Sequence, residues 1–263
     1  MASGSAFLMT TIPQRTQGLG ESARSTIEAL KMRTTRPTVY LFDIDGTLIS
    51  TGGAGRRAME GAFADLHGER APAAVAFSFA GMTDRAIVRS GLTALDQHAP
   101  DAATIDRVLE RYLLRLADEV LRTESFVVHP GVPDVLTWLK NVEQVAIGLG
   151  TGNVKKGAYA KLARGSLDAA FDFGGFGCDA EDRAELLRVG ARRGAEALGL
   201  AVTDCRLVVI GDTPKDVAAA RELNAECIGV GTGGFAPRAL LDLGAHSAFA
   251  TLEDDGVRDA FLG

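Results

Sequence analysis

The chain has 263 residues, of which 46% are hydrophobic, and its 28 lysines and arginines against 34 aspartates and glutamates give a formal net charge of −6. This length and apolar content suffice for one large domain, or for one domain with an insert, and exclude an intrinsically disordered protein. The acidic balance gives no electrostatic footprint for nucleic acid or for an anionic membrane surface.

The cysteines and the hydropathy pattern indicate the compartment. Cys178, Cys205 and Cys227 are too few and too scattered for a disulfide framework or a zinc cluster, so we expect thiols in a reducing environment. No apolar stretch reaches the length of a membrane span, and the N-terminus lacks a basic start followed by an apolar core. These features predict a cytoplasmic protein.

The first 36 residues are rich in Ser, Thr, Gly and Arg and are predicted to form a mobile tail, with a short amphipathic helix over Ser22–Met32. Met32 lies just before the first strand, and its position makes it an alternative start of translation.

The first strong element is an apolar run, Thr38–Phe42, that ends in two carboxylates, Asp43 and Asp45. A strand without polar alternation is typical of a parallel sheet that is covered on both faces. In open α/β sheets ligands bind beyond the carboxyl ends of the strands, so the two aspartates stand where a site is expected.

Two aspartates at i and i+2 on an extended strand point the same way and repel each other unless a proton or a cation intervenes. A hard cation such as Mg²⁺ is therefore implied, and it favours phosphate oxygens as further ligands. Asp43 would be the nucleophile on phosphorus, and Asp45 would carry the proton for the leaving oxygen. Gly46 permits a sharp turn close to a phosphate, and Thr47 adds a hydroxyl.

The plainer interpretations of Asp-x-Asp-Gly are a calcium loop or a solvated turn. An EF-hand loop starting at Asp43 would need Gly where Leu48 stands and Glu where Ala54 stands, so it fails at both positions. A simple turn rarely follows so apolar a strand.

A helical insert is expected over about residues 53–128. A glycine-rich loop at 52–55 leads into a predicted helix over Arg56–Leu66, and two further helices are predicted over Thr83–Leu95 and Ala103–Leu121. The last helix places one apolar stripe on a single face: Ile105, Val108, Leu109, Tyr112, Leu113 and Leu116.

Strands and helices alternate after His129, which is the pattern of a parallel sheet. A helix is predicted over Pro133–Lys140. The predicted strands are Val145–Leu149, Ala169–Phe173, Leu207–Ile210, Cys227–Val230 and Ala248–Ala250.

Polar residues follow the strand at Val145–Leu149. Thr151, Gly152 and Asn153 precede a helix that is expected to begin near Val154. A threonine hydroxyl and free backbone N–H groups at such a position can hold phosphate oxygens, although a plain N-cap is the alternative.

Two more acids follow the strand at Leu207–Ile210. Asp212 ends the strand, and Asp216 lies one helical turn later, past Pro214, which suits a first helical turn. We expect both acids to face the same crevice as Asp43.

These segments resemble the motifs of the haloacid dehalogenase-like (HAD) phosphohydrolases. The sequence Asp-Ile-Asp-Gly-Thr at 43–47 resembles the first motif, Thr151 with its neighbours the second, and Gly-Asp-x-x-x-Asp at 211–216 the fourth. The resemblance implies an α/β fold with a Rossmann-like three-layer parallel-sheet core (residues 37–52 and 129–263) and an inserted α-helical cap (53–128).

The same resemblance implies Mg²⁺ as cofactor, with Asp43, Asp45, Asp212 and Asp216 as the metal set, in which Asp216 could instead orient the cationic residue. It also implies hydrolysis of a small phosphorylated metabolite, most similar to the phosphoglycolate phosphatase-like members. Within the cap, the Gly-Met-Thr-Asp segment at 81–84 is similar to one seen in such caps. Its alternative is an N-cap at Thr83 with Asp84 in the first helical turn.

The third motif of the family is a lysine or arginine that neutralises phosphoryl charge. Arg183 is the predicted residue, because its planar fork suits phosphate oxygens, and Lys155 is the rival. The plain alternative for Arg183 is a surface ion pair with its neighbours Glu181 and Asp182.

One glycine-rich segment, Gly229–Gly234, fits a dinucleotide-binding pattern. It follows a late strand rather than the first one, and Pro237 interrupts the expected helix start, so a loop bordering the site is the simpler interpretation.

Several other activities share this pattern. A dehalogenase does not need Asp45, because it protonates no alkoxide, and a phosphonatase needs a Schiff-base lysine in the cap, where none lies between Lys31 and Lys140. A receiver-like signalling module is far shorter. A phosphomutase keeps the same motifs and stays an alternative, as does a catalytically silent phosphate-binding or regulatory protein. No partner beyond the metabolite is predicted, neither nucleic acid nor membrane, and no oligomeric state is indicated.

Overall fold

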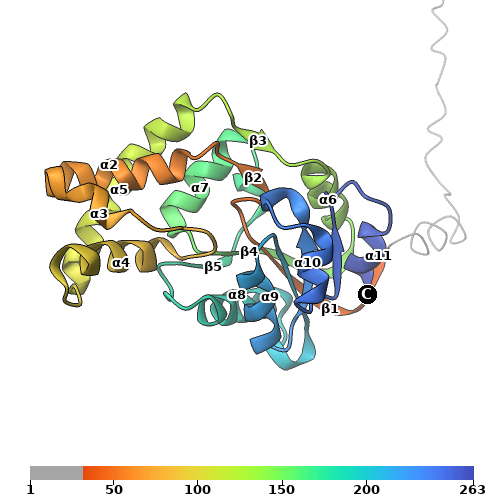
Figure 1. Cartoon of the computed structure of the whole chain (residues 1–263). Helices are drawn as coiled ribbons and strands as arrows, with labels where there is room; N and C mark the ends of the chain where they lie inside the picture. The colour runs from red at the N-terminus through yellow and green to blue at the C-terminus, as the bar shows by residue number, and fades with distance from the viewer. Residues whose placement is uncertain (1–31) are drawn as a thin grey trace, which may run out of the picture. The chain divides into compact units, whose positions relative to one another are not determined.

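The computed structural model describes residues 32–263 (Figure 1). The predicted tail through residue 31 and the predicted helix from Ser22 fall outside this range. Strand β1 (Arg33–Phe42) begins earlier than the predicted Thr38. The predicted mobile tail is therefore wrong for residues 33–36, which belong to this strand. Its register against β4 shifts between Arg33 and Thr38, where Pro37 cannot donate to the ladder.

A parallel sheet of six strands forms the centre of the fold, in the order β5-β4-β1-β6-β7-β8. Beside β1, its members are β4 (Glu143–Thr151), β5 (Gly174–Phe176), β6 (Arg206–Gly211), β7 (Glu226–Val230) and β8 (Ser247–Phe249). The predicted α/β class and Rossmann-like core are confirmed. Because β1 lies between β4 and β6, the ends of these three strands meet at one edge of the sheet.

One predicted strand is wrong. Ala169–Phe173 contains a short 3-10 helix, Asp168–Ala170, and the strand comes later, at Gly174–Phe176. Two consecutive glycines weaken a strand pattern because they present no side chain to pack, so the strand itself carried little signal.

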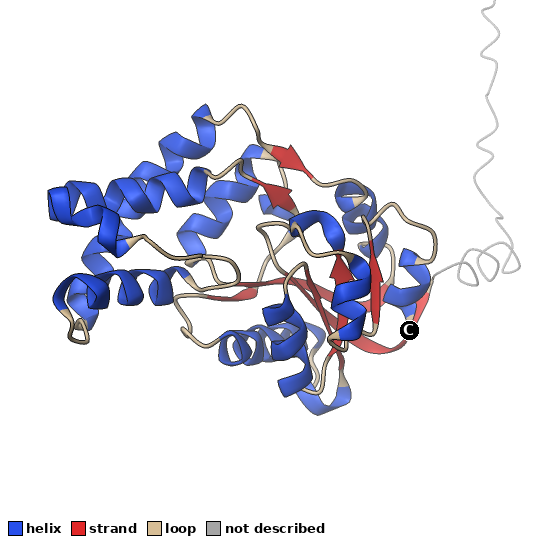
Figure 2. Ribbon diagram, viewed as in Figure 1, coloured by secondary structure: helices blue, strands red, loops and turns tan. Residues whose placement is uncertain are grey.

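Helices cover both faces of the sheet (Figure 2). Tyr40 and Phe42 point into one core with α6 (Val132–Leu139), α7 (Lys155–Arg164) and α11 (Val257–Leu262). Val39 and Leu41 point into the other core with α8 (Arg183–Leu198), α9 (Pro214–Glu222) and α10 (Pro237–Asp242). This alternation along β1 produces the three layers.

The insert between β1 and β4 is helical and has a hydrophobic cluster of its own. It consists of α2 (Ala54–His67), α3 (Ala71–Ala74), α4 (Asp84–Asp96) and α5 (Ala102–Arg122). Five residues of the predicted stripe on α5 are buried there, and Leu113 is partly buried against the same cluster. No helix in the described part of the chain is long and apolar enough to cross a membrane.

A two-stranded antiparallel ribbon joins the insert to the sheet domain, and it was not predicted. Strand β2 (Ile49–Ser50) pairs with β3 (Val127–Val128), so the chain leaves toward the helices and returns from them at adjacent points. Each strand has two residues, which is too short for a period-two pattern to be visible.

Candidate active site

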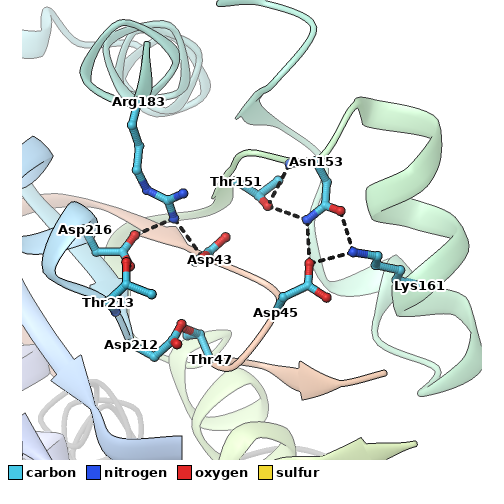
Figure 3. A network of polar contacts seen from close by, with 10 residues as sticks. All are labelled: Asp43, Asp45, Thr47, Thr151, Asn153, Lys161, Arg183, Asp212, Thr213 and Asp216. Carbon is cyan, nitrogen blue, oxygen red and sulfur yellow. Dashed lines mark hydrogen bonds and ion pairs between the residues drawn. The ribbon is translucent and has the colours of Figure 1, made fainter. Parts of the chain in front are cut away.

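The predicted acidic and polar residues meet at the carboxyl edge of the sheet (Figure 3). Asp43 continues β1, and its N–H donates to the carbonyl of Ile210 on β6 at 2.9 Å, which fixes the two strand ends side by side. Asp212 follows β6, and Thr151 is the last residue of β4. All three side chains are buried.

Arg183, the first residue of α8, bridges two of the acids. Its Nη2 lies 2.7 Å from Oδ2 of Asp43 and also pairs with Oδ1 of Asp216. The guanidinium is buried, so the surface ion pair weighed as an alternative is wrong. Glu181 instead accepts two hydrogen bonds from Arg89 of the insert, both of 2.8 Å.

Asp212 and Asp216 are held by threonine hydroxyls. Thr47 Oγ1 donates to Oδ1 of Asp212 at 2.9 Å, and Thr213 donates to Oδ2 of Asp216 from its backbone N–H at 3.0 Å and from its hydroxyl at 2.7 Å. Gly46 makes the turn between Asp45 and Thr47 with a φ of +86°, and a Cβ there would meet Oδ2 of Asp212 at 2.4 Å. A side chain at position 46 would therefore be strained and would clash with the acid.

Asp43, Asp212 and Asp216 fit a divalent metal ion. One oxygen of each carboxylate lies within 4.8 Å of those of the others. Burial raises the pKa of Asp43 to about 6, against the lowering effect of Arg183, and burial with repulsion from Asp43 and Asp216 raises the pKa of Asp212 to about 8. Buried carboxylates that repel each other are relieved by a hard cation, and oxygen donors of this kind are what Mg²⁺ takes.

Asp45 lies in a second polar cluster. Its Oδ2 accepts hydrogen bonds from Nζ of Lys161 at 2.6 Å and from Nδ2 of Asn153 at 2.8 Å. Asn153 also donates to the hydroxyl of Thr151 at 2.9 Å, and its own Oδ1 accepts from Lys161 at 2.7 Å. The carboxylate of Asp45 is not part of the group of three acids described above.

Lys161, on α7, is a site residue that the sequence reasoning missed. Burial lowers the pKa of its ammonium, but the carboxylates of Asp45 and Asp84 more than offset this, and the net shift is upward. Lys155, the predicted rival of Arg183, starts the same helix and has its Nζ 5.7 Å from the ring centre of Phe176. Lys161 could not be recognised from the sequence, because a lysine among the polar residues of α7 gives no sign that it is buried.

The N-terminus of α4 contacts the loop after β4. Thr83 is the N-cap residue and accepts from Ala86 N–H at 3.2 Å, as the plainer interpretation of this segment predicts. Asp84 is also buried and joins the insert to the core: its N–H donates to Gly152 O at 2.8 Å, and its Oδ2 accepts from Val154 N–H at 2.9 Å. A Cβ on Gly152 would lie 2.6 Å from the carbonyl of Met82, so this contact requires glycine.

A cavity of about 420 Å³ lies between the sheet edge and the insert. Asp43, Asp45, Gly46, Thr151, Gly152, Asn153, Arg183 and Asp212 line it, whereas Thr47 and Asp216 stand behind its wall. The glycine-rich segment borders the cavity through Thr232 and Gly233, and Thr232 donates to Gly46 O at 2.5 Å. Its residues Gly231–Gly233 form a short 3-10 helix, which supports the interpretation as a loop rather than a dinucleotide fingerprint.

Known structures share this fold. CbbY from Rhodobacter sphaeroides in complex with phosphate superposes with a TM-score of 0.60 at 19% identity, over 83% of this chain and 96% of that one. A predicted phosphoglycolate phosphatase from Haemophilus somnus gives 0.61 at 14% identity, over 87% and 99%. A proposed β-phosphoglucomutase from Bacteroides vulgatus gives 0.59 at 18% identity, over 92% and 95%.

No curated protein matches the chain in sequence. The sequence profile described as "Hydrolase: haloacid dehalogenase-like hydrolase" matches residues 37–224, which include the first acidic motif, Thr151, Arg183 and both acids at 212 and 216. The chain therefore belongs to the haloacid dehalogenase-like hydrolases.

Proposed function

We propose that this protein is a Mg²⁺-dependent phosphatase that hydrolyses a small phosphorylated metabolite through an aspartyl-phosphate on Asp43. The observation that favours it most is the position of Asp43, which is buried between the guanidinium of Arg183 and the carboxylate of Asp212 and still lines the cavity. A phosphoryl group brought to Asp43 would meet positive charge on one side and a metal-binding carboxylate on the other.

We assign the metal first to Asp43 and Asp212. Both oxygens of Asp216 accept hydrogen bonds from Thr213 or Arg183, so Asp216 is better suited to orient the arginine, and Asp45 is held by Lys161 and Asn153. When bound, Mg²⁺ would neutralise charge on the phosphoryl oxygens.

Thr151 is suited to bind a phosphoryl oxygen. Its Oγ1 accepts hydrogen bonds from the side chain and the backbone N–H of Asn153, at 2.9 and 3.3 Å. A hydroxyl has one proton to donate, and with its lone pairs engaged that proton can point into the cavity. The hydroxyl of Thr47 instead donates its hydrogen bond to Asp212. We therefore assign Thr47 to orienting Asp212 and not to binding the substrate.

The reaction proceeds in two displacements on this assignment. A carboxylate oxygen of Asp43 forms a bond to phosphorus while the bond from phosphorus to the leaving oxygen breaks, and Asp45 gives that oxygen a proton. Water then forms a bond to the phosphorus of the aspartyl-phosphate while Asp45 takes a proton from it. The bond from phosphorus to the Asp43 oxygen breaks, which restores the Asp43 carboxylate and releases inorganic phosphate. Lys161 and Asn153 hold Asp45 in place for both transfers.

The test is turnover of p-nitrophenyl phosphate with Mg²⁺ and with EDTA, using Asp43→Asn as the control. The amide keeps the shape of the side chain but is not a nucleophile, so we expect a loss of several orders of magnitude. Activity of Asp43→Asn within about tenfold of the wild type would refute the nucleophile assignment. A phosphate ester with a second free hydroxyl is needed to separate the phosphatase from a phosphomutase, because p-nitrophenyl phosphate cannot be isomerised. With such an ester, we expect release of inorganic phosphate rather than an isomerised ester.

A further inference from the structure

The cavity wall on the side of the insert carries several apolar side chains. The insert contributes Met59, Phe79, Met82 and Ile87 to it, and the core contributes Phe235. Phosphorus must lie beside Asp43 in the proposed reaction, so this wall faces the part of the substrate that leaves as an alcohol. Its apolar side chains favour an apolar leaving group by excluding water from both surfaces.

The cations that line the cavity already have protein partners. Arg183 is paired through Nη2 with Asp43 and Asp216, although its buried Nε has no hydrogen-bond partner in the described part of the chain. Lys161 is paired with Asp45 and Asn153. Arg56 is the third lining cation.

Arg56 donates hydrogen bonds to residues of the insert. Its Nε donates to Glu60 at 2.8 Å, its Nη2 to the carbonyl of Val75 at 3.0 Å and its Nη1 to the carbonyl of Phe77 at 3.2 Å. Its guanidinium carbon also lies 4.6 Å from the ring centre of Phe79. These contacts hold the segment that carries Phe79 against the cavity, and the guanidinium would have to break them to bind an anion.

The remaining charges on the wall are negative. Beside the acids already described, Asp84 lines the cavity and is buried, with Val154 N–H as its hydrogen-bond donor. A second anionic group on the leaving alcohol would enter a space whose cations are engaged and whose other charges repel it.

One polar atom on this wall lacks a partner. The hydroxyl of Tyr112 lines the cavity on a side chain that is 1% exposed, and it makes no hydrogen bond to any residue in the part of the chain that the structure describes. A hydroxyl at the cavity surface without a protein partner can hydrogen-bond a ligand or water.

We propose that the site takes monophosphates of uncharged, largely apolar alcohols with one neutral hydrogen-bonding group for Tyr112, and rejects leaving groups that carry a carboxylate or a second phosphate. This inference rests on the phosphatase function proposed above. It also departs from the phosphoglycolate-like specificity that the sequence motifs suggest, because glycolate carries a carboxylate.

A matched pair of substrates tests the proposal on the wild-type protein. Carbamoylmethyl phosphate and 2-phosphoglycolate differ only in an amide against a carboxylate, and phenyl phosphate reports general turnover. We expect kcat/KM for the amide to exceed that for the carboxylate by at least about tenfold. Equal or faster turnover of 2-phosphoglycolate would overturn this inference alone, whereas no turnover of any of the three would overturn the proposed function and this inference with it.

Variants of the wall provide the second arm. Met82→Lys places an ammonium beside the leaving group and should raise the ratio of kcat/KM for 2-phosphoglycolate over the amide by about tenfold, whereas the neutral Met82→Gln should leave that ratio near its wild-type value. Tyr112→Phe should lower kcat/KM for the amide more than for phenyl phosphate. If Arg56→Gln selectively lowers turnover of 2-phosphoglycolate, then Arg56 binds the carboxylate and the proposal is wrong.

Discussion

Replacing Arg183 by methionine keeps most of the length of the side chain but removes the guanidinium that joins Asp43 to Asp216. A donor aimed at charge that develops in the transition state is commonly worth about 3 to 4 kcal/mol, or roughly a hundred- to a thousandfold in rate. We therefore expect kcat of Arg183→Met to fall by that factor.

The same change should also destabilise the fold. Removing one partner of a buried ion pair costs about 3 to 5 kcal/mol, because the other charge stays buried without a partner. For a domain of this size, a loss of about 3 kcal/mol lowers Tm by about 6 to 12 °C. Thermal unfolding measured beside steady-state kinetics separates the two effects.

Arg183→Lys is the matched control. It keeps the positive charge, but a single ammonium cannot offer the planar fork that spans both carboxylates, so we expect an intermediate kcat and a smaller fall in Tm. If Arg183→Met retains kcat within about tenfold of the wild type and melts at the same temperature, the guanidinium neither stabilises the transition state nor bridges the acids, and the reasoning fails.

Three further results are expected. Lys161→Met should lower kcat by about tenfold or more because Asp45 loses its orientation, whereas the exposed Lys155→Met should stay within about twofold; the reverse order would place the supporting cation at the start of α7. Asp212→Ala should weaken Mg²⁺ binding, measured by calorimetry, by more than about tenfold, and unchanged affinity would put the metal elsewhere. Burial raises the pKa of Asp43 to about 6 and that of Asp212 to about 8 in the folded protein. As pH rises, the unfolded chain therefore loses these two protons at a lower pH than the folded chain does. Tm of the metal-free protein should then fall as pH rises from about 4 to about 8, and Mg²⁺ should reverse the fall; a flat profile would show that the two acids are not buried together.

The residues at the ends of β1, β4 and β6 were predictable because each follows an apolar run directly. A buried parallel strand has to end where the chain reaches solvent or ligand, so the first polar residues after it, such as Asp43 and Asp212, point to the edge of the sheet. Local sequence therefore contained the position of both acids. Arg183 was predictable for a related reason, since it opens a helix beside the same edge.

Contacts over long sequence distances could not be predicted in this way. Lys161 meets Asp45 only because α7 packs into the same core as Tyr40 and Phe42 of β1, and the local pattern of neither residue encodes that approach. Tyr112 was predicted as part of an apolar stripe, which is correct for its ring, but the stripe does not indicate that the hydroxyl reaches the cavity. In such side chains the apolar body packs in the core, while the polar end can form a hydrogen bond elsewhere.

The ribbon of β2 and β3 has a consequence for how such a protein can evolve. Ile49 pairs with Val128 and Ser50 with Val127, so the chain departs and returns at neighbouring strands, about 4.8 Å apart. The intervening helices add no strand to the six-stranded sheet, and their number and length are therefore independent of its register. Insertions or deletions in these helices that keep the contacts of Asp84 with Gly152 and Val154 would leave the strand ends in register. The strand ends that carry the carboxylates and the helices that cover the cavity are thus encoded in different stretches of one chain.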